Sequence, residues 1–587
     1  MNKKIIAALV VFVIVVATVG YWFSVPVSTP PNQTTTTGPV RSGGSLTLGL
    51  ATEPNSLDPT IALLGYSQYT GVKAIFEGFV IRDLNGEVKP ALAETWEHPD
   101  DVTYIFHLRH GVMFQDGTPF NSSAAVFMDW YVRNGPGTQG RSDWNHTVSS
   151  VQAIDDYTVK YTLFSKAATF LSDFMRVGPT GSMVSPTAVK KWGEEFGTHP
   201  VGTGPFQFAE WVRGSYIKLV ANPNYRQGIP DLDSLVIRYI PDNGVRVLEL
   251  QKGTADFIEV PLTFASQLNA TSNVKMYIGM SDRQMQLSYV NTQPNPKFTS
   301  YFTDVRVRQA INYAINKNEI INTVLDGWAM PGIGAIRYKY AGYAPYLAKY
   351  SYDPDKAKQL LAEAGYPNGF SVVLLTEGKT FRPYAEDTAV LLKSELAQVG
   401  IQVTIQVVDS NTFSKMRFNQ EFDLAMGGWR GNGLADTPQG ILSRLLSSNA
   451  GPGLGKWNWE NIRDPTIDSL VNQLLETPIE DMASWKPLSD QIQKIVIDQA
   501  YECPVFDQLS VQASTTKVNG FAEDPTIGAT IWAPEIGIKV SLAANPSASV
   551  SQIIGTFGEG DLAPQIFITL VTSVKHPSGF PLAASLF

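Results

Sequence analysis

The stretch SVVLLTEGKTFRPYAEDTAVLLKSELAQVGIQVTIQVV, residues 371–408, decides the fold class of this chain. It opens with a short apolar run typical of a buried strand, and residues 384–398 then place Ala and Leu side chains at helical spacing. Gly400 ends the predicted helix, and residues 401–408 alternate as a second strand. A strand, a helix and a strand with short joints predict a right-handed βαβ unit in a parallel sheet.

The next strand along the chain indicates where a ligand would bind. FDLAMGG, residues 422–428, is a further apolar run that ends in two glycines. In open α/β sheets, ligands bind beyond the carboxyl ends of the strands. Residues 429–436 are therefore expected beside a bound ligand.

Helices and strands on either side extend the mixed α/β pattern. Asp353 predicts the N-cap of a helix, and Gly365 predicts the end of the same helix. A second helix is predicted to begin near Asp304. Residues 104–114 alternate like an antiparallel strand, and residues 115–120 contain the Asp-Gly and Thr-Pro steps of a turn.

Length and composition bound the class of protein. The chain has 587 residues, which predicts three or four domains or an elaborated pair. Its 45 Lys+Arg and 54 Asp+Glu give a net charge of −9, and this balance argues against nucleic-acid binding, which needs clustered positive charge. The single cysteine, Cys503, excludes a disulfide framework and a cysteine-rich metal site.

Sequence signatures of catalysis and of cofactor binding are missing. There is no G-x-S-x-G and no H-E-x-x-H motif. Gly378, Lys379 and Thr380 match the end of a phosphate-binding loop, but Val373 stands where that loop needs glycine. Cys503 lies in an apolar stretch and is expected in the core. We predict no catalytic residue, cofactor or metal ion. A glycosidase stays open, because it needs only two carboxylates brought together by the fold.

The two ends of the chain differ from its body. Residues 5–23 are apolar and uncharged, follow two lysines, and are long enough for a membrane span or for a secretory signal. The lysines predict a cytoplasmic N-terminus with the rest of the chain outside the cell. Residues 25–40 are rich in Ser, Thr and Pro, as in an extended stalk. The chain is expected at the cell surface, tethered through residues 5–23, or secreted if that segment is cleaved.

Six collinear sequence blocks cover much of the chain. They are EPNSLDP (53–59), PALAETWEHPDDVTYIFHLRHGVMFQDGTPF (90–120), VGTGPFQFAEW (201–211), VRQAINYAINKNEII (307–321), YDPDKAKQLLAEAGYPNGF (352–370) and FDLAMGGW (422–429). In content and order they resemble the extracellular solute-binding proteins of ABC transporters, family 5, which includes dipeptide-, oligopeptide- and nickel-binding proteins. The likeness covers about residues 44–540. We interpret the blocks themselves as turns and core, not as ligand contacts.

The resemblance implies an α/β fold with two lobes, the type II fold of periplasmic binding proteins. Mixed sheets, hinge strands between the lobes and an extra inserted subdomain belong to this fold. The implied parts are a signal-anchor or transmembrane helix (1–24), a stalk (25–43), a first lobe (44–77, 201–284 and 504–540), an inserted subdomain (78–200), a second lobe (285–503) and a C-terminal extension of unknown role (541–587).

The resemblance also implies a function. Such a protein closes its lobes over a peptide and delivers it to ABC permease subunits in the membrane, while a separate cytoplasmic ATPase supplies the energy. We expect a monomer that binds no nucleic acid. Two alternatives stay open: an oligosaccharide-binding protein of the same family, and a secreted hydrolase such as a glycosidase.

Five residues are the candidate ligand contacts. Trp429 ends the last block, and Arg430 and Asn432 follow it. In peptide-binding members an Asp stands three residues after this Trp and pairs with the amine of the peptide, whereas Asn432 occupies that position here. Asp436 lies nearby as a substitute. Arg382 resembles the Arg that binds the ligand carboxylate in some dipeptide binders, or is a surface residue at the start of a helix.

Aromatic and amide side chains are compatible with the oligosaccharide alternative. Sugar-binding relatives stack a pyranose ring on tryptophan, and Trp457, Trp459 and Trp532 join Trp429 as candidates for this contact. Gln439 suits the recognition of hydroxyl groups, because its amide both donates and accepts hydrogen bonds.

Overall fold

The fold is described from a computed structural model of the chain. It separates into two compact units, Met1–Ala543 and Ala544–Phe587, and the second lies outside the described residues. No helix in the described part of the chain is long and apolar enough to cross a membrane, and residues 5–23 lie outside that part. The structure describes residues 43–61, 66–83, 87–138, 140–167, 169–290, 301–338, 340–378, 384–428, 437–448, 457–479, 481–519, 522–524, 528–530 and 541–542.

Eleven strands of the described residues form one mixed sheet. The order is β15 (Ile401–Val408), β14 (Phe370–Glu377), β16 (Leu424–Gly427), β12 (Val274–Tyr289), β17 (Cys503–Thr515), β11 (Phe257–Glu259), β1 (Ser45–Leu50), β10 (Ser234–Tyr239), β9 (Tyr216–Ala221) and β8 (Phe206–Val212), with β13 (Ala329–Pro331) on β17 beside this path. Parallel pairs join β14 to β15 and β16, and β1 to β10 and β11, whereas the other pairs of this sheet are antiparallel.

The predicted βαβ unit is confirmed. β14 and β15 pair in parallel along their whole length, and α11 (Ala385–Gln398) connects them. Leu392 and Leu396 of α11 are fully buried, as the helical spacing requires. Gly400 has a φ of 91°, in the left-handed region that lets the chain turn from helix to strand. The predicted third strand is β16, which lies parallel to β14 on its other side.

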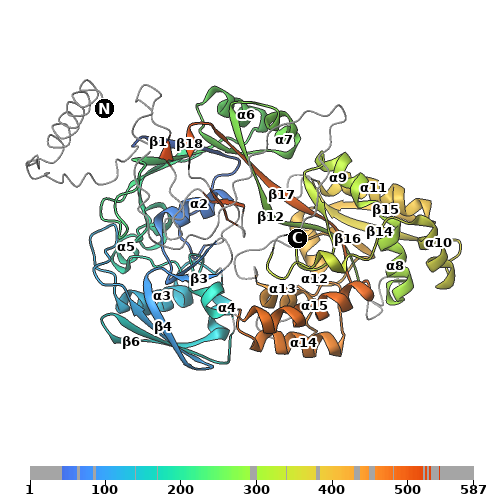
Figure 1. Cartoon of the computed structure of the whole chain (residues 1–587), viewed down its shortest axis with the longest axis horizontal. Helices are drawn as coiled ribbons and strands as arrows, with labels where there is room; N and C mark the ends of the chain where they lie inside the picture. The colour runs from blue at the N-terminus through green and yellow to red at the C-terminus, as the bar shows by residue number, and fades with distance from the viewer. Residues whose placement is uncertain are drawn as a thin grey trace, which may run out of the picture. The chain divides into compact units, whose positions relative to one another are not determined.

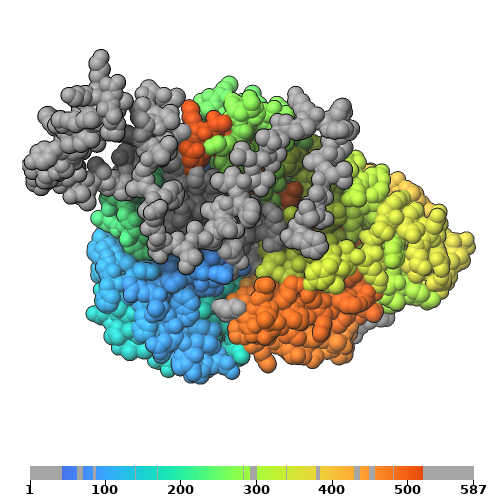
Figure 2. All heavy atoms as spheres, viewed as in Figure 1, coloured from blue at the N-terminus to red at the C-terminus, as the bar shows by residue number. Residues whose placement is uncertain are grey.

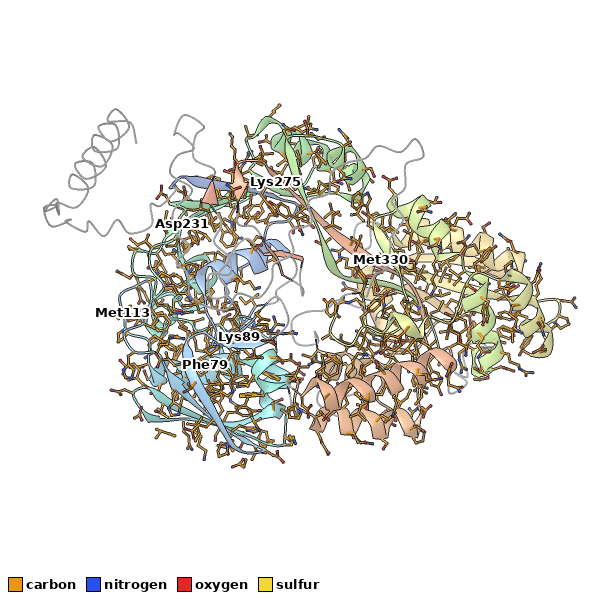
Figure 3. The ribbon with its side chains drawn as sticks, viewed as in Figure 1. Phe79, Lys89, Met113, Asp231, Lys275 and Met330 are labelled. Atoms are coloured by element: carbon orange, nitrogen blue, oxygen red, sulfur yellow. The ribbon has the colours of Figure 1, made fainter. Side chains whose placement is uncertain are left out.

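Two long strands run through the middle of this sheet. β12 and β17 pair antiparallel from Val274↔Thr515 to Leu287↔Cys503. β17 also pairs with β11 and, nearer its start, with β13, where Met330 (labelled in Figure 3) lies opposite Asp507. Figure 1 shows both strands crossing from the green part of the chain to the yellow and orange part. They have the position that hinge strands between two lobes require.

A separate antiparallel sheet lies within residues 78–200. Its order is β4 (Ala93–Asp100), β5 (Thr103–Leu108), β7 (Thr158–Leu163) and β6 (Val148–Asp155). The predicted strand over residues 104–114 is too long, because β5 ends at Leu108 and the chain turns at Gly111, whose φ is 72°. Two-stranded pairs join β2 (Val80–Arg82) to β3 (Val88–Pro90), β18 (Val518–Asn519) to β21 (Ser541–Leu542), and β19 (Ala522–Asp524) to β20 (Gly528–Thr530).

Helices begin at the predicted caps. The side chain of Asp304 accepts a hydrogen bond from Arg306 N, and that of Asp353 accepts one from Lys356 N. The helices are α2 (Tyr66–Ile75), α3 (Ser122–Asn134), α4 (Arg141–Thr147), α5 (Pro186–Trp192), α6 (Asn243–Lys252), α7 (Leu262–Asn269), α8 (Val305–Ala314), α9 (Lys317–Leu325), α10 (Pro354–Glu363), α11, α12 (Ser410–Phe418), α13 (Pro438–Leu446), α14 (Pro465–Glu476) and α15 (Met482–Asp498).

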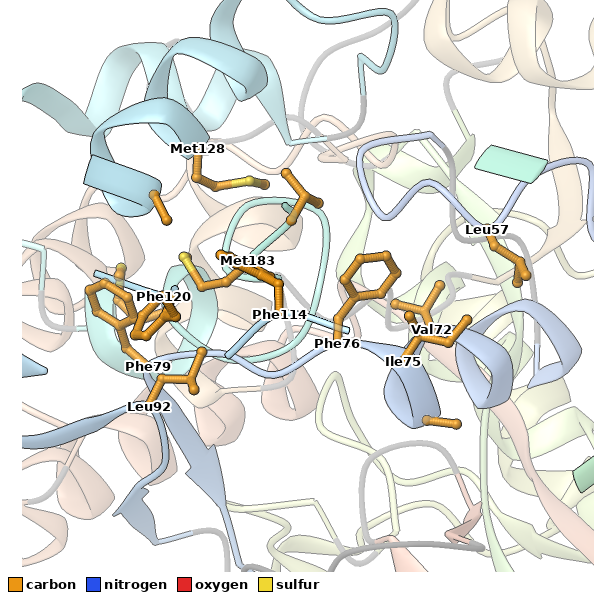
Figure 4. Packing of buried hydrophobic residues seen from close by; sticks show 14 of the residues in the cluster. Leu57, Val72, Ile75, Phe76, Phe79, Leu92, Phe114, Phe120, Met128 and Met183 are labelled. Atoms are coloured by element: carbon orange, nitrogen blue, oxygen red, sulfur yellow. The ribbon is translucent and has the colours of Figure 1, made fainter. Parts of the chain in front are cut away.

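Buried hydrophobic side chains gather in two large clusters. One is built from side chains between Leu46 and Phe257 together with Val518, and the other from side chains between Val247 and Ala513. A smaller cluster packs α13 against α14 and α15. Figure 4 shows part of the first cluster, in which Leu57, Leu92 and Phe114 of the family-like blocks are buried. The interpretation of these block residues as core is therefore confirmed.

Gln115 joins two of the blocks through their backbones. Its Nε2 donates to the carbonyl oxygens of Ile75, Gly204 and Phe206 at 3.1, 3.1 and 2.9 Å. Its Oε1 accepts from Gly202 N at 3.0 Å. A Cβ on Gly202 would lie 2.2 Å from Ile75 O, so glycine is required for this close approach.

Candidate functional site

The strand before the predicted ligand segment is held against a hinge strand. β16 pairs antiparallel with β12, and Gly427 lies opposite Gln286. A Cβ on Gly428 would lie 1.7 Å from the carbonyl oxygen of Gln284, so a larger residue does not fit without a backbone shift. The two glycines of the motif thus fix the end of β16 against β12.

The five predicted ligand contacts lie outside the described residues. The described chain ends at Gly428 before this segment and resumes at Thr437 after it, and it resumes at Tyr384 after the other gap. The roles of these five residues therefore stay predictions. They are Trp429, Arg430, Asn432, Asp436 and Arg382.

Helix α13 begins directly after the ligand segment. Thr437 caps it, because the Thr437 Oγ1 accepts from Gly440 N at 3.1 Å, and all of its residues are buried. The Gln439 side chain is fully buried, and its Nε2 donates to the Thr477 carbonyl oxygen at 3.3 Å. Its Nε2 is engaged in helix packing, and the recognition of ligand hydroxyl groups by Gln439 stays a prediction.

A buried arginine supports the end of β16. Arg417 of α12 donates from Nη1 to the Gly428 carbonyl oxygen at 3.2 Å and from Nη2 to Ser288 Oγ at 2.9 Å. Its Nη2 also lies 3.7 Å from Glu460 Oε1, and both side chains are almost fully buried. A planar guanidinium can make these contacts at once, which a lysine cannot. Arg417 therefore fixes the residue from which the ligand segment starts.

Two buried carboxyl groups accompany this arginine. Glu460 Oε1 accepts from Gln286 Nε2 at 3.2 Å. Burial raises the pKa of Glu460, and the positive charge of Arg417 opposes that rise. Burial, reinforced by the charge of Glu460, raises the pKa of Glu502 well above its usual range. One guanidinium therefore faces two carboxyl groups, of which Glu502 favours the protonated form.

The tryptophans proposed as sugar platforms pack on arginines of the protein. The Arg417 guanidinium lies 3.7 Å from the ring centroid of Trp459, and the Arg444 guanidinium lies 5.5 Å from that of Trp457. The two rings stack on each other with their centroids 6.4 Å apart. These contacts occupy ring surface that a sugar would need. Trp532 lies outside the described residues.

The hinge strands carry a buried polar cluster that sequence reasoning missed. Gln284 Nε2 donates to Asp507 Oδ1 at 2.9 Å and to the Gly334 carbonyl oxygen at 3.0 Å. Tyr338 N donates to Asp507 Oδ2 at 2.8 Å, and burial raises the pKa of Asp507 to about 6. No sequence signal singles out this cluster, because Gln284 directly follows Ser281, Asp282 and Arg283 in β12, and Asp507 is followed by another polar residue in β17.

Neither a nucleophile nor a metal centre emerges from the described residues. Cys503 is fully buried in β17, as predicted, and burial raises the pKa of its thiol to about 12, which disfavours the reactive thiolate. Across the described ranges, no group of three or more His, Cys, Asp or Glu side chains is placed to hold a metal ion. The buried polar groups described above instead hold the end of β16 and the start of α13.

Comparison of the sequence with known proteins assigns the chain to one protein family. Residues 87–452 match the family model of the bacterial extracellular solute-binding proteins, family 5 Middle. The glutathione-binding protein GsiB of Shigella flexneri serotype 5b is 32% identical over 484 residues, which cover 81% of this chain and 91% of the relative.

Solved structures share the fold. HbpA2 from Haemophilus parasuis is 25% identical with a TM-score of 0.75, and the match covers 85% of this chain and 100% of that chain. The periplasmic binding protein DppA from Helicobacter pylori, solved with the peptide STSA, is 28% identical with a TM-score of 0.67, covering 86% and 98% of the two chains. The α/β fold with two lobes, the type II fold of periplasmic binding proteins, is confirmed by these matches.

Proposed function

Because the chain belongs to the bacterial extracellular solute-binding proteins of family 5, we propose that it captures peptides outside the cell and delivers them to an ABC permease. Family membership makes it a binding component of a transport system and not an enzyme. The observation that carries the peptide assignment is the likeness to a glutathione-binding protein over 81% of this chain. The likeness to a binding protein solved with a bound peptide supports the same substrate class.

The proposed peptide site is the segment at residues 429–436 together with Arg382. Trp429 packs on the peptide, and Arg430 or Arg382 binds its carboxylate through a charge-assisted hydrogen bond. Asp436 balances the peptide amine, because Asn432 carries no charge. Gly428 at one end of the segment and the cap Thr437 at the other support this proposal, since both are fixed by contacts of the scaffold.

The oligosaccharide alternative rests on Asn432, whose neutral amide suits hydroxyl groups. The packing of Trp457 and Trp459 on arginines counts against it. A hydrolase has no support in the described residues, and the family assignment places the chain among binding proteins. Peptide and oligosaccharide are therefore the two outcomes that an experiment must separate.

Thermal unfolding with ligand panels separates them. The chain from residue 41 onward is melted with glutathione, with dipeptides and tripeptides, with the same peptides acetylated at the amine, and with oligosaccharides. A ligand at 100 times its Kd stabilises the folded state by about 2.7 kcal/mol, so binding raises the melting temperature. We expect a rise with free peptides, a smaller rise with acetylated peptides and none with oligosaccharides. A rise with oligosaccharides alone would overturn the peptide proposal.

Two tryptophan variants test the place of the site. Trp429→Ala is expected to weaken binding of the stabilising peptide by roughly tenfold or more, because a large aromatic contact is lost. Trp130→Ala is the matched control, since Trp130 is 52% exposed on α3 of the inserted subdomain. Equal affinity of Trp429→Ala and the control would place the site elsewhere.

Location, partners and lobe boundaries complete the proposal. Residues 5–23 tether the chain to the membrane, and residues 25–43 form a stalk that holds the binding protein on the extracellular side as a monomer. The first lobe comprises residues 44–77, 201–284 and 504–540. The inserted subdomain comprises residues 78–200, and the second lobe comprises residues 285–503.

The permease is a separate membrane protein, and its ATPase is cytoplasmic. Recovery of the intact chain from culture medium instead of the membrane fraction would contradict the tether.

A further inference from the structure

Helix α4 presents an acidic side chain on a rigid support. α4 belongs to the inserted subdomain, and its Trp144 is buried and donates from Nε1 to Asp129 Oδ1 at 2.8 Å. Arg141 of the same helix donates from Nε to the Val132 carbonyl oxygen at 2.9 Å. Asp143 lies between these two anchored residues, and its side chain is 12% exposed. Its carboxylate is therefore held in place by the subdomain itself.

Helix α13 presents an arginine from the second lobe. Arg444 lies in the last turn of α13, and its side chain is 9% exposed. Its carbonyl oxygen accepts from Trp457 N at 2.9 Å, and Leu445 and Leu446 beside it are buried in the cluster of α13, α14 and α15. Because Thr437, the N-cap of α13, directly follows residue 436, the position of α13 is linked to the end of the proposed ligand segment.

These two side chains meet across the lobes. Arg444 Nη2 lies 3.6 Å from Asp143 Oδ2. Figure 1 shows α4 beside the group of α13, α14 and α15, and in Figure 2 the cyan and orange parts of the chain meet. The helices that carry them pack in separate hydrophobic clusters, Trp144 of α4 in one and Leu445 of α13 in the other, so the ion pair joins parts of the chain that are packed independently.

A second carboxyl group lies in the field of Arg444. Asp173, in the helical turn Phe170–Phe174 of the inserted subdomain, is buried. Burial raises the pKa of Asp173 to about 6, and the positive charges of Arg444, Arg176 and Arg82 oppose the rise. Arg444 therefore lies close enough to the Asp173 carboxyl group of the subdomain to oppose the rise in its pKa.

We infer that Arg444 is a positioning residue for lobe closure, whose ion pair with Asp143 holds the inserted subdomain against the second lobe. The pair forms only when the lobes are together, so it favours the closed form relative to the open form. A partly exposed ion pair changes such an equilibrium by about two- to fivefold, and a shielded one by more. Since apparent affinity scales with the fraction of the competent form, the pair also tightens ligand binding. The inference rests on lobe closure and not on peptide as the ligand.

Lobe closure is measurable with two fluorescent dyes. Ile154 of β6 and Met482 of α15 are 56% and 61% exposed, one on the inserted subdomain and one on the second lobe. Both are replaced by cysteine and labelled, while Cys503 is buried and stays unlabelled. Single-molecule energy transfer then gives the closed fraction of the full chain without ligand and over a glutathione titration. The variants are Arg444→Gln, Asp143→Asn and the double variant.

We expect each single variant to lower the ratio of closed to open molecules by about two- to tenfold, and the double variant to lower it no further. The controls are Lys494→Gln and Asp101→Asn, which remove the same charges at sites 64% and 71% exposed and should leave the ratio unchanged. Equal closed fractions in wild type and Arg444→Gln at every glutathione concentration, or additive losses in the double variant, would overturn the inference. The melting temperature of each ligand-free variant verifies its folding.

The two proposals fail in different ways. If glutathione leaves the closed fraction of the wild type unchanged, the result counts against peptide as the ligand, while the ligand-free comparison still decides the role of Arg444. If glutathione closes all variants equally well, the peptide proposal stands and the ion pair has no role in closure.

Discussion

Burial sets the charge of Glu502, which shares its surroundings with Glu460 and Arg417. The pKa of Glu502 is raised by burial and by the charge of Glu460, whereas an unfolded glutamate titrates near pH 4.3. The folded state therefore keeps this proton to higher pH than the unfolded state does. Its contribution to the free energy of unfolding falls as pH rises above about 4.3 toward the raised pKa. We expect Glu502→Gln, which is neutral at all pH values, to remove this loss.

The measurement is the melting temperature of wild type and Glu502→Gln between pH 5 and pH 9. The stabilising effect of the substitution should grow with pH and reach about 1–3 kcal/mol, because each unit of pKa shift corresponds to about 1.4 kcal/mol. Glu194→Gln, at an exposed position, is the control and should follow the wild type. A constant difference between Glu502→Gln and wild type across the range would show that Glu502 does not titrate in this way.

At the scale of single elements, the end of β16 depends on two glycines with different surroundings. A Cβ at Gly428 would lie 1.7 Å from the backbone oxygen of Gln284, whereas one at Gly427 would lie 2.7 Å from the side-chain Nη1 of Arg417. A backbone oxygen in a paired strand cannot move as a side chain can. We expect Gly428→Ala to lower the free energy of unfolding by about 1–3 kcal/mol and to weaken ligand binding, with a smaller effect for Gly427→Ala. Urea unfolding of both variants measures the contrast, and equal losses would argue against a backbone clash at residue 428.

Elements that depend on neighbouring residues were predictable from sequence. The βαβ unit follows from the spacing of apolar residues within residues 371–408, and the caps Asp304 and Asp353 act within one turn of helix. The strand predicted over residues 104–114 was extended too far, because alternation continues in the sequence past the turn at Gly111. Local patterns report the preference of a segment, not the point at which tertiary contacts end it.

The candidate site was less predictable, because its groups come from distant parts of the chain. Gln284 and Asp507 are 223 positions apart, and Glu460 meets Gln286 across 174 positions. No periodicity links such pairs, and both strands carry several polar residues, so the sequence does not show which of them are buried together. The family-like block FDLAMGGW predicts a ligand segment directly after β16, whose position as a strand is confirmed. The contacts of the five candidate ligand residues remain predictions of that resemblance.

At the scale of the whole molecule, β12 and β17 are the structural link between the lobes. Their pairing shifts register between Met280 and Gln284 and again before Gln286, whereas it is regular from Val274 to Met280. Such bulges interrupt the ladder of backbone hydrogen bonds and bend a strand. On its other edge, β17 pairs with β13 near its start and with β11 near its end. The hinge strands therefore combine regular pairing with one irregular region where bending costs less.

Hydrogen exchange tests whether β12 bends in its irregular region when the lobes close. Amides of residues 281–283 lie in the irregular region, and we expect them to exchange rapidly in the ligand-free chain and roughly tenfold more slowly with the stabilising peptide. Amides of residues 274–279 are in the regular part of β12 and should exchange slowly under both conditions. Helix α4 should also gain protection, because closure brings Asp143 to Arg444. The opposite result is that the peptide changes exchange at residues 274–279 and leaves exchange at residues 281–283 unchanged. It would show that the strands bend in the regular part of their pairing and not at the bulge.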